Sequence, residues 1–167
     1  MSLVPEPADG RIGEALGLLH EKLRLSRTTL RIDLPIEPRM PMTHELLSPG
    51  TSSLAGRVVA AGGSPTVRRL LESRSAVIVE DTARLPALDP HFDDAGYKAM
   101  VADYELTAMI VAPIFDGDHL AGILSLQAVD GPRAWSSDEI AFVESTVARI
   151  RDDVIAAGDG AGDLRQP

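Results

Sequence analysis

The chain of 167 residues contains no cysteine. This absence excludes disulfide bonds, thiolate metal sites, cysteine nucleophiles and thioether-linked cofactors. The sequence also lacks the signatures of several enzyme classes, because it has no G-x-S-x-G elbow, no G-x-x-x-x-G-K-[ST] phosphate loop and no H-E-x-x-H zinc motif. No constellation of residues supports catalysis, and we expect that the protein is not an enzyme.

Neither a membrane nor a nucleic acid is an expected partner. The sequence has no run of ~18 apolar residues of the kind that crosses a bilayer. Its start, MSLVPEPADG, lacks the basic and apolar regions of a signal peptide. The formal net charge is −9, with 16 Lys and Arg against 25 Asp and Glu, and an acidic surface repels phosphate backbones. We therefore expect a cytoplasmic protein that binds no nucleic acid.

The length fits one domain, and a hydrophobic content of 44% is enough for a sizeable core. Apolar spacing, turn residues and capping residues predict the elements. They are helices over about 10–25, 54–59, 64–74 and 89–103, strands over about 28–34, 40–47, 76–79, 107–115 and 120–129, and a long helix that opens with a capping box of Ser136 and Glu139. We expect a flexible arm over 1–8, the domain over 9–157 and a disordered tail over 158–167.

The order of these elements predicts an α+β fold, in which one antiparallel sheet carries helices on its faces. Asp116-Gly117 predicts a tight turn between the last two strands. Apolar residues stand at successive positions in 109–112 and at Ile123-Leu124. A strand with one wet face would alternate instead, so the sheet is expected to be covered on both faces.

Several segments, taken in order, resemble the GAF domain family. Near the C-terminal end they are Ala112-Pro113-Ile114, the Asp116-Gly117 turn, GILSL at 122–126, Trp135 and SSDE at 136–139. Earlier in the chain, LAGRVVAAG and VIVEDT resemble a glycine-containing element of the family and its following strand. The resemblance covers about residues 12–157, which is nearly the whole chain.

The resemblance implies a sheet of five or six antiparallel strands. The first and last helices lie on one face, often at a dimer interface, and short helices and loops cover a ligand pocket on the other face. Leu124 and Leu126 would then face the helices, since side chains alternate along a strand. The candidate ligand-binding residues are Asp81, Thr82, Tyr97, Tyr104, Met109, Val111, Ser125 and Gln127.

Each candidate also has an ordinary structural explanation. Gln127 would orient a ligand with its amide, or it is solvated at a strand end. Asp81 would hold an amine or hydroxyl, or it caps a turn. Tyr97 and Tyr104 lie seven residues apart on one helix face, where they either roof a pocket or pack in the core.

The long C-terminal helix carries an apolar stripe with spacings of 3, 4, 3 and 4 residues. This stripe predicts a homodimer interface, and the alternative is packing onto helix 10–25 of the same chain. Its residues are Ile140, Val143, Val147, Ile150 and Val154.

Histidines and arginines give weaker signals. His91 would be the ligand of a haem iron. No second residue stands at a ligand spacing from it, so haem is not expected. The other histidines are interpreted as surface residues: His20, His44 and His119. Three arginines would bind a carboxylate or phosphate, or they are solvated: Arg57, Arg68 and Arg69.

The sequence therefore predicts a small-molecule-sensing regulatory domain that signals through its terminal helices to a protein partner or its dimer mate. The alternatives are a ligand-free dimerisation module and a haem-based sensor. No cofactor is expected. Relatives that attach a bilin use a cysteine, and they carry Asp-Ile-Pro where this chain has Gly62-Gly63-Ser64. The cysteine-dependent methionine sulfoxide chemistry of one branch is excluded, and the cyclic-nucleotide pattern is not apparent.

Overall fold

A computed structural model of the protein describes residues 4–34, 40–55 and 64–163. The elements are α1 (Glu6–Lys22), β1 (Arg27–Ile32), β2 (Met42–Leu47), α2 (Pro65–Ser73), β3 (Val77–Val79), α3 (Leu85–Leu88), the 3₁₀ helix η2 (Pro90–Phe92), α4 (Ala95–Tyr104), β4 (Ala108–Asp116), β5 (His119–Ala128) and α5 (Ser137–Asp163). Most of the short helix predicted over 54–59 lies outside the described residues.

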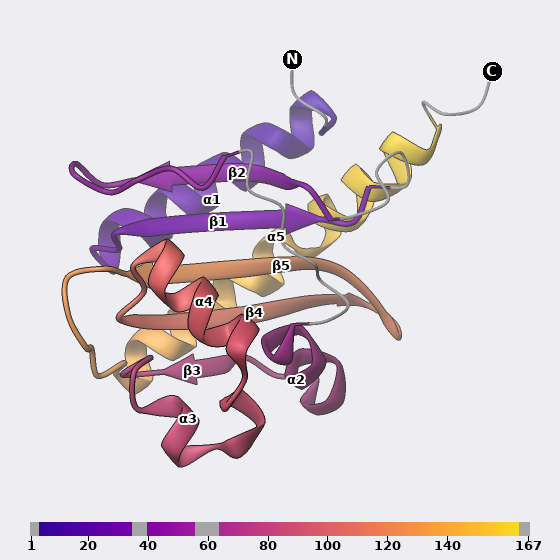
Figure 1. The fold of residues 1–167 in the computed structure, drawn as a ribbon. Coiled ribbons are helices and arrows are strands. Elements are labelled where there is room, and N and C mark those ends of the chain that lie inside the picture. Colours follow the sequence, from indigo (N-terminus) through magenta and orange to yellow (C-terminus); the bar gives the residue numbers. More distant parts are fainter. Residues whose placement is uncertain (1–3, 35–39, 56–63, 164–167) are drawn as a thin grey trace.

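The five strands form one antiparallel sheet in the order β2-β1-β5-β4-β3 (Figure 1). The hairpin of β4 and β5 lies near its centre, and Gly117 in the connecting turn has a φ of +58°, which favours glycine. The predicted α+β fold with one antiparallel sheet is confirmed, and β1 joins the hairpin by pairing with β5.

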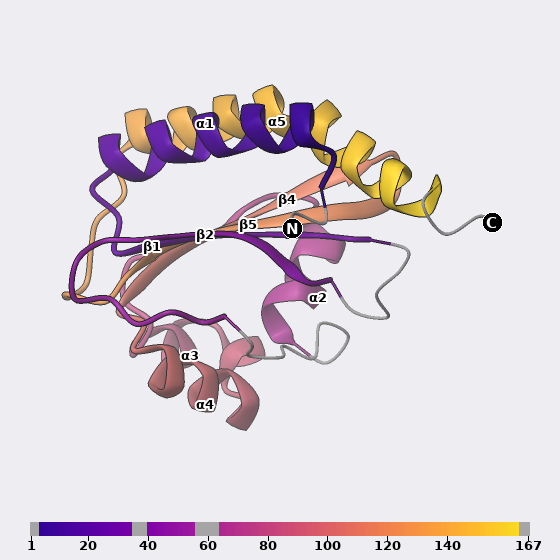
Figure 2. The same ribbon diagram turned by 90° about the horizontal axis from the view of Figure 1, so that it is seen from above.

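One face of the sheet is covered by α1 and α5, which lie side by side (Figure 2). Leu124 and Leu126 of β5 are fully buried beneath these helices, as predicted. Gly122 lies on the same face, where an added Cβ would come within 3.0 Å of Val154 Cγ1 and 3.1 Å of the Arg31 carbonyl oxygen. The close approach of α5 to the sheet therefore depends on a glycine at this position.

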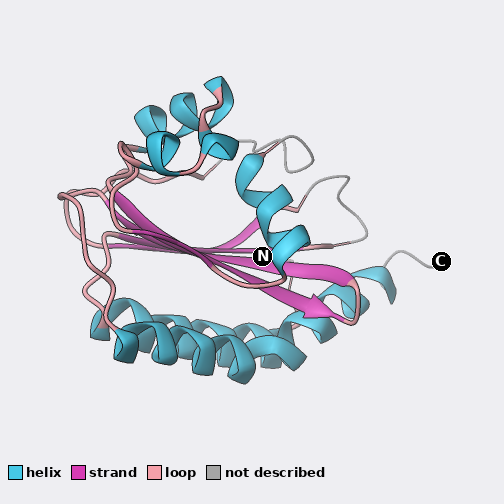
Figure 3. Ribbon diagram, turned by 90° about the horizontal axis from the view of Figure 1, so that it is seen from below, coloured by secondary structure: helices cyan, strands magenta, loops and turns pink. Residues whose placement is uncertain are grey.

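The other face is covered by the shorter elements α2, α3, η2 and α4 (Figure 3). Because side chains alternate along each strand, Met109 and Val111 of β4 point to this side while Ile110 points to α1 and α5. The sheet thus separates two hydrophobic clusters. This arrangement explains the successive apolar residues of 109–112, since both faces of β4 are buried.

Three boundaries differ from the sequence prediction. The helix predicted over 89–103 is divided, because the Asp94 carboxylate accepts a hydrogen bond from the Tyr97 amide and begins α4 separately. The predicted arm is shorter, since α1 begins at Glu6 and Val4 is buried. The predicted disordered tail is helical as far as Asp163, where α5 ends.

No helix in the described ranges combines the length and apolar character that crossing a membrane requires.

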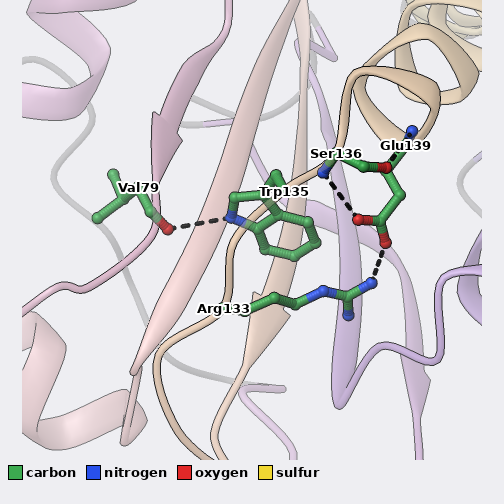
Figure 4. Close-up of polar contacts among 5 residues, drawn as sticks. All are labelled: Val79, Arg133, Trp135, Ser136 and Glu139. Carbon is green, nitrogen blue, oxygen red and sulfur yellow. Dashed lines mark hydrogen bonds and ion pairs between the residues drawn. The ribbon is translucent and has the colours of Figure 1, made fainter.

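The start of α5 is fixed by the predicted capping box (Figure 4). The Glu139 amide donates to Ser136 Oγ at 3.1 Å, and the Ser136 amide donates to Glu139 Oε1 at 2.9 Å. Burial alone would raise the pKa of Glu139, but hydrogen bonds from Ser136 and Arg133 outweigh it and lower the pKa. Trp135 Nε1 donates to the Val79 carbonyl at 3.1 Å, which ties this connection to β3.

Candidate ligand cavity

A small cavity of about 70 Å³ lies between the sheet and the short-helix layer. Its floor comes from β1, β5 and β4, and its cover comes from the first turn of α2, from α4 and from the segments beside them. The lining residues are Thr29, Arg31, Leu54, Ser64, Thr66, Val67, Met100, Tyr104, Leu106, Met109, Val111, Ile123, Ser125 and Gln127.

The floor has a polar part and an apolar part. Thr29 of β1 pairs with Ser125 of β5, and Ser125 pairs in turn with Val111 of β4. Every second residue of β1 points to the cavity side, so Arg31 follows Thr29 on the polar part. Met109 lies beside Val111 on the apolar part. The cavity can therefore hold a molecule with one polar end and one apolar end.

A fully buried arginine anchors one end of the cavity. Arg27 is 0% exposed and donates from Nη1 to Gln127 Oε1 at 2.7 Å. The same guanidinium donates to the Ser52 carbonyl and to the Tyr104 carbonyl. Arg27 thus ties the sheet to the segment after β2 and to the end of α4, and it fixes the side-chain amide of Gln127.

Arg31 has fewer partners. Its Nη1 donates to the Met40 carbonyl at 3.1 Å. No carboxylate in the described ranges forms an ion pair with Arg31, and burial lowers the pKa of its guanidinium, with only the Tyr104 hydroxyl acting in the opposite direction. A desolvated cation without a counter-ion is costly. Arg31 is therefore the group on the cavity wall that gains most from an anionic neighbour.

The first turn of α2 contributes a second unsatisfied group. Thr66 is 6% exposed, and its Oγ1 has no hydrogen-bond partner within the described part of the chain. The N-cap residue, Ser64, makes no side-chain capping hydrogen bond, and both residues line the cavity. First-turn amides have no partner within their own helix, and Pro65 has no amide hydrogen, so the Thr66 and Val67 amides and the positive end of the dipole lie at this end of α2.

The structure brings together five of the eight predicted ligand-binding residues. Tyr104, Met109, Val111, Ser125 and Gln127 all line the cavity. Their role in binding stays a prediction, and Gln127 is buried rather than solvated at a strand end.

The other three predicted residues do not line this cavity. Asp81 accepts a hydrogen bond from the Ala83 amide and so caps a turn. Thr82 Oγ1 donates to the Leu106 carbonyl at 2.6 Å. The Tyr97 hydroxyl donates to the Thr82 carbonyl, and burial, followed by the charge of Asp81, raises the pKa of Tyr97 to about 12. The hydrogen bonds of Thr82 and Tyr97 thus connect α4 and the segment after it to the chain that follows β3.

Sequence reasoning missed the polar residues of β1 and the first turn of α2. A usable signal exists for β1, because Arg27, Thr29 and Arg31 place polar side chains at every second position of the strand. Thr66 carries no comparable signal, since its contact with the sheet depends on the chain path between β2 and α2.

The apolar stripe of α5 packs inside the chain. Val143, Ile150 and Val154 are at most 2% exposed and belong to the cluster beneath α1. Ile140 and Val147 are partly buried against the same cluster. Val143, Ile150 and Val154 thus follow the alternative of packing within one chain, while Ile140 and Val147 keep part of their surface exposed. The homodimer and its interface stay a prediction.

Two histidines that were interpreted as surface residues have specific partners. His20 is half-buried between Thr28 Oγ1 and Ser48 Oγ, and burial lowers its pKa. His44 Nε2 lies 2.7 Å from Asp9 Oδ1. His91 Nε2 contacts the Pro65 carbonyl oxygen at 3.1 Å, which occupies the nitrogen that haem would need.

The remaining basic candidates do not gather at the cavity. His119 is exposed and forms an ion pair with Asp33. Arg69 pairs with Asp89, Arg68 is exposed, and Arg57 lies outside the described residues.

An antiparallel sheet between a pair of long terminal helices and a layer of short helices, with a cavity on the short-helix side, defines a compact α+β class of domain. The chain belongs to the GAF domain family, whose model matches residues 12–151. The comparison with curated proteins found no match.

Solved structures with the same fold include the phycoerythrobilin-bound GAF domain from a cyanobacterial phytochrome, at 20% identity and a TM-score of 0.65, covering 94% of this chain and 95% of that one. The far-red absorbing dark state of JSC1_58120g3 with bound biliverdin IXa has 17% identity and a TM-score of 0.63, covering 84% and 85%. The GAF domain from Acinetobacter phosphoenolpyruvate-protein phosphotransferase has 13% identity and a TM-score of 0.65, covering 95% and 86%. The TM-scores establish a shared fold with these structures.

The comparisons correct the expectation that no cofactor is involved. Two of these GAF domains are described with a bilin bound, so a bilin cofactor is compatible with the fold and the expectation of none is wrong. The described residues of this chain do not fit a bilin as they lie, because pockets for ligands of drug size have volumes of ~300–1,000 Å³ and this cavity has about 70 Å³. A thioether link is also excluded, since the chain has no cysteine.

Proposed function

We propose that this GAF domain is a non-enzymatic regulatory sensor that binds a small molecule in the cavity between the sheet and the short-helix layer. The observation that carries the proposal is a cavity whose wall includes a buried hydroxyl, Thr66 Oγ1, for which the described residues provide no hydrogen-bond partner. A native protein rarely leaves such a group unsatisfied without a reason. Membership of the GAF family and the bilin-bound domains among its structural neighbours support the same role.

The signal would reach a second copy of the chain through the outer faces of α1 and α5. These helices pack on the side of the sheet opposite the cavity, so Met109 contacts the cavity while the adjacent Ile110 contacts the helix layer. A ligand that binds more tightly to one of two conformations of the cavity floor would favour that conformation. The alternating residues would pass the change to α1 and α5. Ion pairs of Arg11 with Asp153 and of Arg149 with Glu14 hold the two helices together as one unit.

Native mass spectrometry, with an absorption spectrum of the same sample, tests this proposal. Protein purified without additives is measured alone and after addition of biliverdin, short carboxylates, amides and alcohols. We expect a dimer that binds at least one of these compounds with a stoichiometry of one per chain. A chain that stays monomeric refutes the output through a second copy, and a chain that binds none of them refutes the sensor.

A pair of variants locates the binding. Ser125→Leu adds three carbon atoms to the cavity floor and removes the hydroxyl, while Ser145→Leu makes the same change on an exposed position of α5. We expect Ser125→Leu to abolish binding and Ser145→Leu to leave it unchanged. Equal binding by both variants would show that the ligand lies elsewhere.

A further inference from the structure

The cavity wall carries a positive charge that the described residues do not balance. Arg31 lines the cavity, and within the described residues its guanidinium donates a hydrogen bond only to a neutral acceptor, the Met40 carbonyl. Burial lowers the pKa of Arg31, and no acidic side chain of the described ranges opposes this effect. Guanidinium groups match carboxylates in geometry, because two N–H donors meet two oxygens.

A second electropositive element faces the same cavity. The first turn of α2 contributes Ser64, Thr66 and Val67 to the lining, and its N-cap side chain makes no capping bond. Free amides and the helix dipole favour an anion at such an end. Because the cavity has only about 70 Å³, a molecule inside it lies close to both Arg31 and this turn.

We propose that the cavity takes a small organic carboxylate, whose carboxylate group is held by Arg31, the Thr66 hydroxyl and the first turn of α2. The proposal rests on the sensor function proposed above and names the chemical class of its ligand. Thr29 and Ser125, which pair across β1 and β5, add two hydroxyls on the floor.

The size and the apolar wall restrict the rest of the molecule. A cavity needs about 10–15 Å³ of free volume to hold one water, so a cavity of about 70 Å³ has room for roughly five non-hydrogen atoms. Met109, Val111 and Ile123 form the apolar part of the floor. Acetate and propionate fit this description, with the short carbon chain against β4 and the carboxylate toward β1 and α2.

The experiment compares propionate with propionamide, which has the same shape and no charge. The full chain, labelled with ¹⁵N, is titrated with each compound at matched ionic strength, and the backbone signals of Thr66 and Ser125 report binding. We expect propionate to shift these signals in a saturable manner and propionamide to bind at least about tenfold more weakly, because hydrogen bonds to charged groups are the stronger class.

Variants assign the selectivity to Arg31. Arg31→Gln should reduce propionate affinity at least about tenfold and remove the preference over propionamide. Arg84→Gln makes the same change at an exposed position before α3, outside the cavity lining, and should leave both affinities unchanged. Arg31→Lys keeps the charge and provides the measurement if Arg31→Gln does not fold. Its affinity for propionate should lie between the affinities of the wild type for propionate and for propionamide.

The outcomes separate this proposal from the sensor function. Equal binding of propionate and propionamide at the cavity signals overturns the carboxylate class and leaves the cavity as a ligand site. No shift with either compound also overturns the carboxylate class, and the sensor function then depends on the wider set of compounds measured by native mass spectrometry. Propionate selectivity that survives Arg31→Gln overturns the role of Arg31.

Discussion

The buried hydroxyl of Thr66 allows a test of whether the cavity wall is destabilised in the ligand-free protein. An unsatisfied buried polar group costs about 1–3 kcal/mol, and Thr66 Oγ1 is such a group within the described residues. Thr66→Val keeps the shape of the side chain, and valine and threonine have similar helix propensities. We therefore expect Thr66→Val to raise the free energy of unfolding by about 1 kcal/mol.

Thr82 provides a matched control for this substitution. It is 2% exposed, but its Oγ1 donates to the Leu106 carbonyl at 2.6 Å. Thr82→Val removes this bond and leaves a buried carbonyl unpaired, so the free energy of unfolding should fall by about 1–3 kcal/mol. The same chemical change is thus expected to have opposite signs at two similarly buried positions.

Urea unfolding followed by circular dichroism measures both variants beside the wild type. In a chain of this size, 1 kcal/mol corresponds to a change in Tm of about 2–4 °C, so thermal unfolding provides an independent reading. If Thr66→Val destabilises the protein as much as Thr82→Val, the Thr66 hydroxyl has a partner in solution. In that case it no longer supports a ligand site.

Three further predictions concern other parts of the molecule. Hydrogen bonds at the capping box lower the pKa of Glu139 against the opposing effect of burial. The ionised Glu139 therefore stabilises the fold above the unfolded pKa near 4.5, and this stabilisation is lost as the pH falls. Thermal unfolding of Glu139→Gln should show a smaller fall in Tm between neutral and acidic pH than the wild type. Gly122→Ala should lower the free energy of unfolding by about 1–3 kcal/mol, since the new Cβ would meet Val154; urea unfolding unchanged from wild type would contradict the packing described. Because burial raises the pKa of Tyr97 to about 12 from 10.0, its neutral form stabilises the fold below pH 10 and this contribution is lost as pH rises through 12. An ultraviolet titration of Tyr97→Phe should therefore lack the phenolate transition that the wild type shows at about pH 12.

The central hairpin could be predicted well because its signals are local. Period-two alternation along each strand assigns Met109 and Ser125 to one face and Leu124 to the other. The Asp116-Gly117 turn predicts the hairpin but not its full register, because the pairing of β4 with β5 shifts by one residue between Ile114 and Phe115. The capping box was predictable for the same reason, since its two residues lie three positions apart. Such signals depend on neighbouring residues and not on the rest of the fold.

The cavity could be predicted only in part, because it depends on contacts between distant segments. Arg31 and Thr66 lie on elements that no local pattern brings together, and the volume between them depends on how α2 packs on the sheet. The position of the α5 stripe was also undetermined, because an apolar face fits a partner chain as well as it fits α1. The division of the helix predicted over 89–103 depends on a single side chain, Asp94, whose hydrogen bond competes with helix continuation.

The alternation of side chains along the central strands has a consequence for how such a domain can evolve. Met109 and Ile110 are neighbours in the chain, yet one contributes to the cavity and the other to the packing of α1 and α5. Substitutions at the odd-numbered positions of 109–111 in β4 and 123–127 in β5 therefore alter what the cavity accepts, while the even-numbered positions between them preserve the scaffold beneath the helices. Ligand preference and structural integrity are encoded in two interleaved sets of residues, so one set can diversify while the other is held constant by selection.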